Sequence, residues 1–182
     1  RLPEDFILAV GTIEPRKNLS RLLDAVQRLR QKGDDARLVV VGSKGWLYEG
    51  FFRHLEELQL GDAVLLPGYV PDADLPAIYS AAKVFVLPSL YEGFGLEVLE
   101  AMACGTAVVC SRTSSLPEVG GDAARYFDPT DVEEMAEAIG AMWHDEALQA
   151  EMARRGLAQA ARFSWAQAAE ETMAVYQRAM SL

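Results

Sequence analysis

FILAVG, at residues 6–11, is a short uninterrupted apolar run that ends in a glycine. LVVVG at residues 38–42 repeats this pattern, and further apolar runs follow at residues 64–66, 84–87 and 107–110. Continuous runs rich in β-branched residues are typical of parallel strands that are covered on both faces. The sequence therefore predicts a parallel sheet between two layers of helices.

Helical patterns separate these runs. In the clearest one, apolar residues recur at helical spacing over residues 19–29, with Asn18 before them as a candidate N-cap and Gly33 after them. Weaker helical patterns cover residues 48–60, 74–82, 96–104 and 132–143. Strands that alternate with helices predict a Rossmann-like, doubly wound α/β fold.

The expected organisation is a single domain over residues 1–182, with the Rossmann-like core ending near residue 145. Residues 146–182 show no strand pattern and form a predicted helical tail that is divided near residues 163–165. A chain of 182 residues, 51% of them hydrophobic, can bury one ordinary core.

Composition argues against several classes of protein. A net charge of −10 disfavours binding to nucleic acid, which needs a basic surface. No apolar run reaches the roughly 18 residues of a transmembrane helix, and the first residues do not resemble a signal peptide. Cys104 and Cys110 are interpreted as buried thiols of a reducing compartment. His54 and His144 lie far from each other and from any cysteine pair, so no zinc site is expected.

The loop after the first strand carries two cations. Doubly wound folds bind ligands beyond the carboxyl ends of their strands, and GTIEPRKN at residues 11–18 places Arg16 and Lys17 there, just before a helix. An arginine fork, a mobile lysine and the N–H groups of a helix start suit phosphate oxygens. An equally simple interpretation is two solvated loop charges. The second loop, GSKG from Gly42, carries only part of a dinucleotide fingerprint.

The loop after the fourth apolar run, PSLYEGFGLEVLE at residues 88–100, is the most informative. Gly93 and Gly95 flank Phe94 where the next helix begins, so exposed N–H groups could approach a diphosphate closely.

That next helix is predicted to be largely buried, because apolar residues cover most of its circumference: Leu96, Val98, Leu99, Met102 and Ala103. Glu97 and Glu100 fall on one strip, about 60° apart. These carboxylates either accept hydrogen bonds from vicinal ribose hydroxyls or form an ordinary solvated strip.

Asp72 and Asp74 could be taken for a divalent-metal motif. Pro71 precedes them and a helical pattern follows, so one of the two aspartates is interpreted as an N-cap. No metal site is expected.

Taken in order, these motifs resemble the large retaining family of nucleotide-sugar glycosyltransferases with a GT-B fold, family 4. The resemblance covers nearly the whole chain and centres on Glu92 and Glu100, which seven residues separate. The similar segments are a first phosphate loop at residues 11–18, a second strand end at 41–42, a base-contacting turn at 68–70, the signature segment at 90–96 and the start of a terminal crossover helix at 163–165.

The resemblance implies a role for each matching position. Glu92 would bond hydroxyls of the donor sugar, and Glu100 would bond those of the ribose. Arg16 and Lys17 would neutralise the diphosphate leaving group and, with Glu92, make up the catalytic residues. The positions expected to contact the nucleotide are Gly11, Thr12, Gly42, Val70, Gly93, Phe94, Gly95, Leu96 and Glu100.

The family is generally metal-independent, so no metal or other cofactor is expected. Its favoured chemistry is front-face attack on an oxocarbenium-like sugar, with the leaving phosphate accepting the acceptor's proton, so no catalytic base is named. Thr12 stands where many relatives carry arginine, which leaves the diphosphate contacts to Arg16 and Lys17. Lys83 stands where the family often has aspartate, and is interpreted as structural.

A GT-B enzyme has two Rossmann-like domains, and this chain resembles only the second one. The N-terminal acceptor domain is therefore expected to be absent, and the chain to bind nucleotide but transfer little or no sugar. Residues 11–18 resemble those of bacterial mannosyl- and rhamnosyltransferases of surface polysaccharide assembly, which favours GDP-mannose and a glycan or lipid-linked acceptor. The whole enzyme is expected in the cytoplasm, with association with the inner face of the membrane left open.

Three alternatives compete with this interpretation. A non-catalytic nucleotide-binding or receiver-type α/β module would need an acidic pocket where Gly11 and Thr12 end the first strand. A dehydrogenase would need a complete glycine fingerprint there. A GT-B epimerase or phosphorylase stays open, because its distinguishing base or lysine could lie on the other half.

Overall fold

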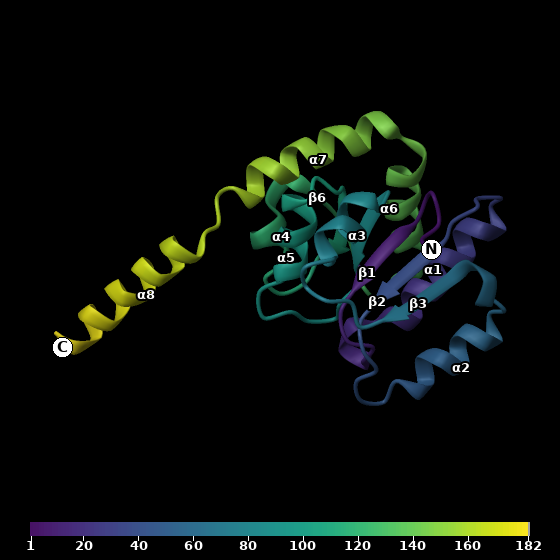
Figure 1. The fold of residues 1–182 in the computed structure, drawn as a ribbon, viewed down its shortest axis with the longest axis horizontal. Coiled ribbons are helices and arrows are strands. Elements are labelled where there is room, and N and C mark those ends of the chain that lie inside the picture. The colour runs from purple at the N-terminus through teal and green to yellow at the C-terminus, as the bar shows by residue number, and fades with distance from the viewer. Residues whose placement is uncertain (182) are drawn as a thin grey trace.

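The computed structural model describes residues 1–181, which form a six-stranded parallel sheet with helices on both faces (Figure 1). The strand order is β3-β2-β1-β4-β5-β6, the order of a Rossmann fold, which confirms the predicted fold class. The strands are β1 (Ile7–Val10), β2 (Leu38–Val41), β3 (Val64–Gly68), β4 (Val84–Leu87), β5 (Val108–Ser111) and β6 (Ala124–Phe127).

Strand residues alternate between two apolar clusters, one on each face of the sheet. In β1, Ile7 and Ala9 join the cluster of α1, α2 and α6, whereas Leu8 joins the cluster of α3, α4 and α5. The helices are α1 (Leu19–Gln31), α2 (Glu49–Glu57), α3 (Leu75–Ala81), α4 (Leu96–Ala103), α5 (Leu116–Gly120), α6 (Val132–His144), α7 (Glu146–Ala160) and α8 (Trp165–Met180), with short 3-10 helices η1 (Pro15–Lys17), η2 (Gly61–Ala63) and η3 (Gly121–Ala123). Because both faces are covered, the central strands read as continuous apolar runs.

Two elements escaped the sequence analysis. β6 lies at the edge of the sheet and has the sequence ARYF, in which Arg125 is exposed and Tyr126 is only partly buried, so it carries no apolar run. α5 has five residues with a proline in its first turn, too few for a helical pattern to register.

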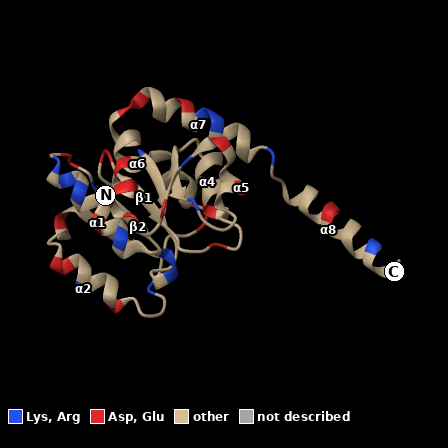
Figure 2. Cartoon of the chain, turned by 180° about the vertical axis from the view of Figure 1, so that it is seen from behind, with Lys and Arg blue, Asp and Glu red and all other residues tan. Residues whose placement is uncertain are grey.

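α7 and α8 have different surroundings. α7 packs on the body, where Gly156 lies against Met102 and the side-chain amide of Gln159 donates to the carbonyl of Val119 at 2.8 Å. α8 projects away from the body (Figure 1), carries few charges (Figure 2) and buries none of its residues. The packed body therefore extends through Ala160. Within residues 1–181 no helix combines the length and hydrophobicity of a membrane span.

Candidate functional site

Glycines at the carboxyl ends of neighbouring strands bring the first loops together. The N–H of Gly42 donates to the carbonyl of Gly68, and the N–H of Gly11 donates to that of Val41, both at 2.9 Å. A Cβ on Gly42 would lie 2.0 Å from the carbonyl oxygen of Gly11, so a larger residue would force the backbones apart. The predicted contact residues Gly11 and Gly42 are thus adjacent, and Thr12 is exposed beside them.

Asn18 ties the first loop to two other loops. It lies between η1 and α1 with a φ of +56°, and its Nδ2 donates to the carbonyls of Pro88 at 2.9 Å and Pro129 at 2.8 Å. Its side chain makes no cap hydrogen bond, so the expected capping role is wrong although the position is the N-cap. The amide group is used instead to satisfy two buried carbonyls, which holds the loop before α1 in place.

The loop after β4 is fixed through its backbone. The N–H of Leu90 donates to the carbonyl of Arg16 at 2.9 Å, which joins this loop to the first one. The N–H of Glu92 donates to Oγ of Ser114 at 3.0 Å, and the hydroxyl of Ser115 donates to the carbonyl of Glu92 at 3.1 Å. The two loops that the sequence singled out are therefore one connected structure.

These contacts bring the three predicted catalytic residues together in a charged cluster. Nζ of Lys17 lies 2.9 Å from Oε1 of Glu92 and 2.5 Å from Oε1 of Glu97. Nη1 of Arg16 lies 2.7 Å from Oε2 of Glu92, and its Nη2 lies 2.7 Å from Oε1 of Glu14. Two cations thus face three carboxylates, and the cluster has one net negative charge when all are ionised.

Glu92 is the fixed centre of this cluster. Its side chain is 8% exposed, and the buried hydroxyl of Ser89 donates to its Oε1 at 2.6 Å. Burial alone would raise the pKa of Glu92, but hydrogen bonds from Lys17 and Ser89 and the charges of Lys17 and Arg16 outweigh it. The pKa of Glu92 is therefore lowered, and the carboxylate is ionised at neutral pH.

Most of the Arg16 guanidinium is engaged within the chain. Its Nε donates to Glu14 at 2.9 Å, and its Nη1 donates to the carbonyl of Tyr91 at 3.0 Å besides pairing with Glu92. The other oxygen of Glu14 accepts from the indole N–H of Trp46 at 3.0 Å. Burial would lower the pKa of Arg16, but Glu92 and Glu14 raise it above its ordinary value. A bidentate contact to phosphate would therefore require a carboxylate to move.

The start of α4 presents backbone donors to the same region. The N–H groups of Gly93, Phe94 and Gly95 have no acceptor among residues 1–181, and Gly95 adopts a φ of +102° that favours glycine. Glu97, in the first turn of α4, reaches Lys17, so this helix start lies close to the ammonium group. Gly93 and Phe94 are exposed, whereas Gly95 is buried. Exposed N–H groups beside a cation are the chemistry that binds anions.

α4 is less buried than the sequence predicted. Val98, Ala101 and Met102 pack into the core, but Leu96 is 44% exposed and Ala103 is also exposed. The prediction of a largely buried helix is therefore wrong, because only one side of α4 faces the sheet.

Glu100 lies exposed on α4, and its Oε2 accepts a hydrogen bond from the hydroxyl of Tyr79 at 2.9 Å. Burial raises the pKa of Tyr79, and the charge of Glu100 raises it further, so Tyr79 remains a donor. Val70 packs against the apolar cluster that α4 covers, on the same face as Glu100. Glu100 is therefore not a buried carboxylate, and its contact with ribose stays a prediction.

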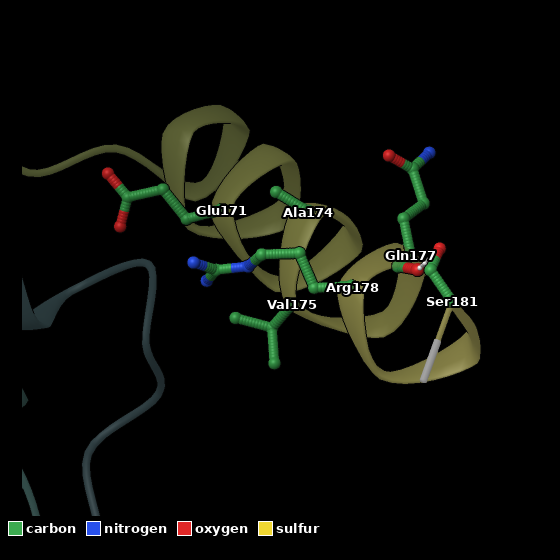
Figure 3. Close-up of a pocket in the computed structure, with 6 residues that line it drawn as sticks. All are labelled: Glu171, Ala174, Val175, Gln177, Arg178 and Ser181. Atoms are coloured by element: carbon green, nitrogen blue, oxygen red, sulfur yellow. Dashed lines mark hydrogen bonds between the residues drawn. The ribbon is translucent and has the colours of Figure 1, made fainter.

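Two other features lie apart from the charged cluster. Asp74 occupies the N-cap position of α3, although its side chain makes no cap hydrogen bond, and within residues 1–181 no three metal-binding side chains gather. Figure 3 shows a hollow along α8 that is lined by side chains of α8 and of the residue that follows it: Glu171, Ala174, Val175, Gln177, Arg178 and Ser181. This hollow belongs to a single exposed helix and does not include the charged cluster.

Sequence reasoning missed the residues that hold the cluster together. Ser89 lies two residues beyond the end of β4, a position that suits a supporting hydroxyl, and the sequence alone could have indicated it. Glu97 was noted only as a partner of Glu100 on the helix surface, whereas the structure turns it toward Lys17. That contact joins residues 80 positions apart, and nothing in the local sequence marks it.

A family model described as glycosyl transferases group 1 matches residues 1–159. The chain belongs to this family. Its fold is similar to that of sucrose-phosphate synthase from Thermosynechococcus elongatus, with a TM-score of 0.88 and 30% identity over 99% of this chain and 47% of the other. These findings agree with the GT-B, Rossmann-like fold.

Several relatives with curated names are mannosyltransferases, and others are named D-inositol 3-phosphate glycosyltransferase. O-antigen chain mannosyltransferase B of Escherichia coli is 42% identical over 95% of this chain and 46% of its own length. MMP alpha-(1->4)-mannosyltransferase of Mycolicibacterium hassiacum is 36% identical over 96% of this chain and 43% of its own length. The chain thus spans a little under half the length of these relatives.

Proposed function

We propose that this chain is the donor-binding, C-terminal half of a retaining glycosyltransferase of family 4. It binds a nucleoside-diphosphate hexose, with GDP-mannose as the donor, and works with an N-terminal domain that holds a glycan or lipid-linked acceptor. The names of the mannosyltransferase relatives support the choice of sugar.

The observation that carries this proposal is the cluster of Arg16, Lys17 and Glu92 beside the unpaired N–H groups at the start of α4. A diphosphate needs cations and exposed N–H donors together, and this edge of the sheet supplies both. No metal is required for this assignment, because the charge on the diphosphate meets two side-chain cations.

In the proposed reaction the bond between the anomeric carbon and the diphosphate oxygen breaks, and the acceptor hydroxyl bonds to the same face of the sugar. Its proton goes to the departing phosphate. Lys17 and Arg16 stabilise the charge that develops on the leaving group, a contribution that grows toward the transition state. Glu92, held by Ser89, positions the sugar through its carboxylate.

The second half of the enzyme is proposed to cover α8. This helix carries large apolar side chains that are more than half exposed: Trp165, Met173, Val175, Tyr176 and Met180. A helix of this kind is stable when another surface packs on it. The chain alone is therefore expected to bind nucleotide and to transfer little or no sugar.

The experiment is a calorimetric titration of the chain with GDP, UDP, ADP and NAD, repeated with Glu100→Ala. GDP should bind saturably, and Glu100→Ala should weaken it by about tenfold, because two hydrogen bonds to ribose hydroxyls are lost. Glu118→Ala, an exposed glutamate on α5, is the matched control and should bind as the unchanged chain does.

Each other outcome is informative. Preference for UDP or ADP over GDP would keep the donor-binding function and change the donor. Binding of NAD alone would favour a dinucleotide-binding module. The proposal would be rejected if neither the chain nor a protein joined to its N-terminal half bound any of the four ligands. Robust sugar transfer by the chain alone would reject the requirement for a second domain.

A further inference from the structure

Lys17 is shared between two carboxylates that differ in how firmly they are held. Its side chain is 6% exposed, and its Nζ contacts Glu92 and Glu97 at the distances given above. Glu92 is anchored by Ser89 and Arg16 and is 8% exposed. Glu97 is 23% exposed, and its Oε2 has no partner among residues 1–181. Of the two partners of Lys17, Glu97 is therefore the one that can leave.

The charge of the cluster makes such a departure necessary for an anion to bind. With Glu97 in place, the cluster already has one more negative than positive charge. A diphosphate that approached this arrangement would meet net repulsion at short range. If Glu97 turned away from Lys17, the ammonium would offer its N–H to a phosphate oxygen at the position that the carboxylate occupies.

The surroundings of Glu97 suit a diphosphate for the same reason that they suit a carboxylate. Glu97 lies in the first turn of α4, where the helix dipole favours negative charge. The unpaired N–H groups of Gly93, Phe94 and Gly95 lie at the same helix start. An anion in this place would meet the ammonium of Lys17 and these backbone donors together.

We propose that Glu97 is an internal substitute for the diphosphate, which holds Lys17 until the donor displaces it and which excludes simple anions from the site. This inference rests on the proposed donor site. Glu97 raises the threshold for binding at this site: a ligand must bring nucleoside contacts as well as a diphosphate to displace it. Inorganic pyrophosphate brings only the charge and is kept out.

The test compares binding of GDP and of inorganic pyrophosphate to the chain and to three variants by calorimetry. Glu97→Gln removes the competing charge and should tighten both ligands by about tenfold, as expected for one unit charge near a partly screened site. Glu97→Ser should do the same. Glu97→Asp keeps the charge and should behave as the unchanged chain.

Glu133→Gln is the matched control. Glu133 occupies the same first-turn position of α6 and also pairs with a lysine, Lys32, at 3.2 Å. Its removal takes away the same charge and the same kind of ion pair, so it should leave both affinities unchanged. If Glu133→Gln raised the affinities for GDP and pyrophosphate as much as Glu97→Gln does, the effect would be one of overall charge and the proposal would be overturned.

The outcomes separate this inference from the proposed function. If the unchanged chain binds GDP and Glu97→Gln binds it no more tightly, the inference is wrong and the donor site stands. If neither the chain, nor any variant, nor a protein joined to its N-terminal half binds GDP or pyrophosphate, both are wrong. If only Glu97→Gln and Glu97→Ser bind pyrophosphate, the exclusion of simple anions is established directly.

Discussion

Nζ of Lys17 lies 2.9 Å from Oε1 of Glu92, and both side chains are almost fully buried at the carboxyl edge of the sheet. The two residues come from loops that follow β1 and β4, which pair as neighbours in the sheet. Buried opposite charges at this distance depend on each other, because either one alone would be a charge without compensation in a medium of low polarity. The ion pair therefore links the stability of the domain to the geometry of its candidate site.

Replacing Lys17 by methionine tests that link. The substitution leaves Glu92 with Arg16 as its remaining cation, and we expect it to lower the free energy of unfolding by about 3 kcal/mol. Urea denaturation measures the change. The control is Lys32→Met, which breaks a half-exposed pair with Glu133 and should cost about 0.5 kcal/mol or less. Equal losses in the two variants would contradict a structural role for the buried pair.

The lowered pKa of Glu92 predicts how stability depends on pH. A carboxyl group whose pKa is lower in the folded than in the unfolded chain stabilises the fold fully above its ordinary value, 4.5 for glutamate. The contribution is lost as the pH falls below 4.5 and passes through the folded pKa. Between pH 7 and pH 3 the free energy of unfolding should therefore fall less in Glu92→Gln than in the unchanged chain. Glu118→Gln, a control at an exposed position, should show the same decrease as the unchanged chain.

The sequence predicted the features that depend on consecutive residues of the chain. Apolar runs such as residues 38–42 are visible because the strands are buried on both faces. β6 was missed because, at the edge of the sheet, its exposed Arg125 and partly buried Tyr126 leave no continuous apolar run. The loop with Arg16 and Lys17 was found because strand ends are where such folds bind ligands.

What the sequence did not predict depends on contacts between distant segments. The side-chain amide of Asn18 satisfies carbonyls 70 and 111 positions away, although its place before α1 suggested a helix cap. The exposure of Leu96 depends on which side of α4 meets the sheet, and helical spacing alone does not fix that choice. Partners of this kind follow from the assembled fold, where tertiary contacts override local preference.

Gly42 is expected to tolerate no side chain. Its φ is +149°, and an added Cβ would lie 2.0 Å from the carbonyl oxygen of Gly11, so Gly42→Ala must separate two strand ends. We expect a loss of about 3 kcal/mol or more in the free energy of unfolding, measured by thermal or urea denaturation. Gly50→Ala is the control: Gly50 lies in α2 with nothing near its Cβ position, and alanine there should stabilise by about 0.5 kcal/mol. A neutral Gly42→Ala would refute the close approach.

Removing α8 should leave the stability of the body unchanged. A chain ending at residue 164 loses a helix with no buried residue, so its free energy of unfolding should stay within about 0.5 kcal/mol of that of the full chain. A chain ending at residue 145 also loses α7, including the buried Gln159 and Met152, and should be strongly destabilised. Urea denaturation distinguishes the two truncations. A large loss on removing α8 alone would mean that this helix folds back on the body in solution, and would contradict the proposal that its apolar side chains are kept for a second domain.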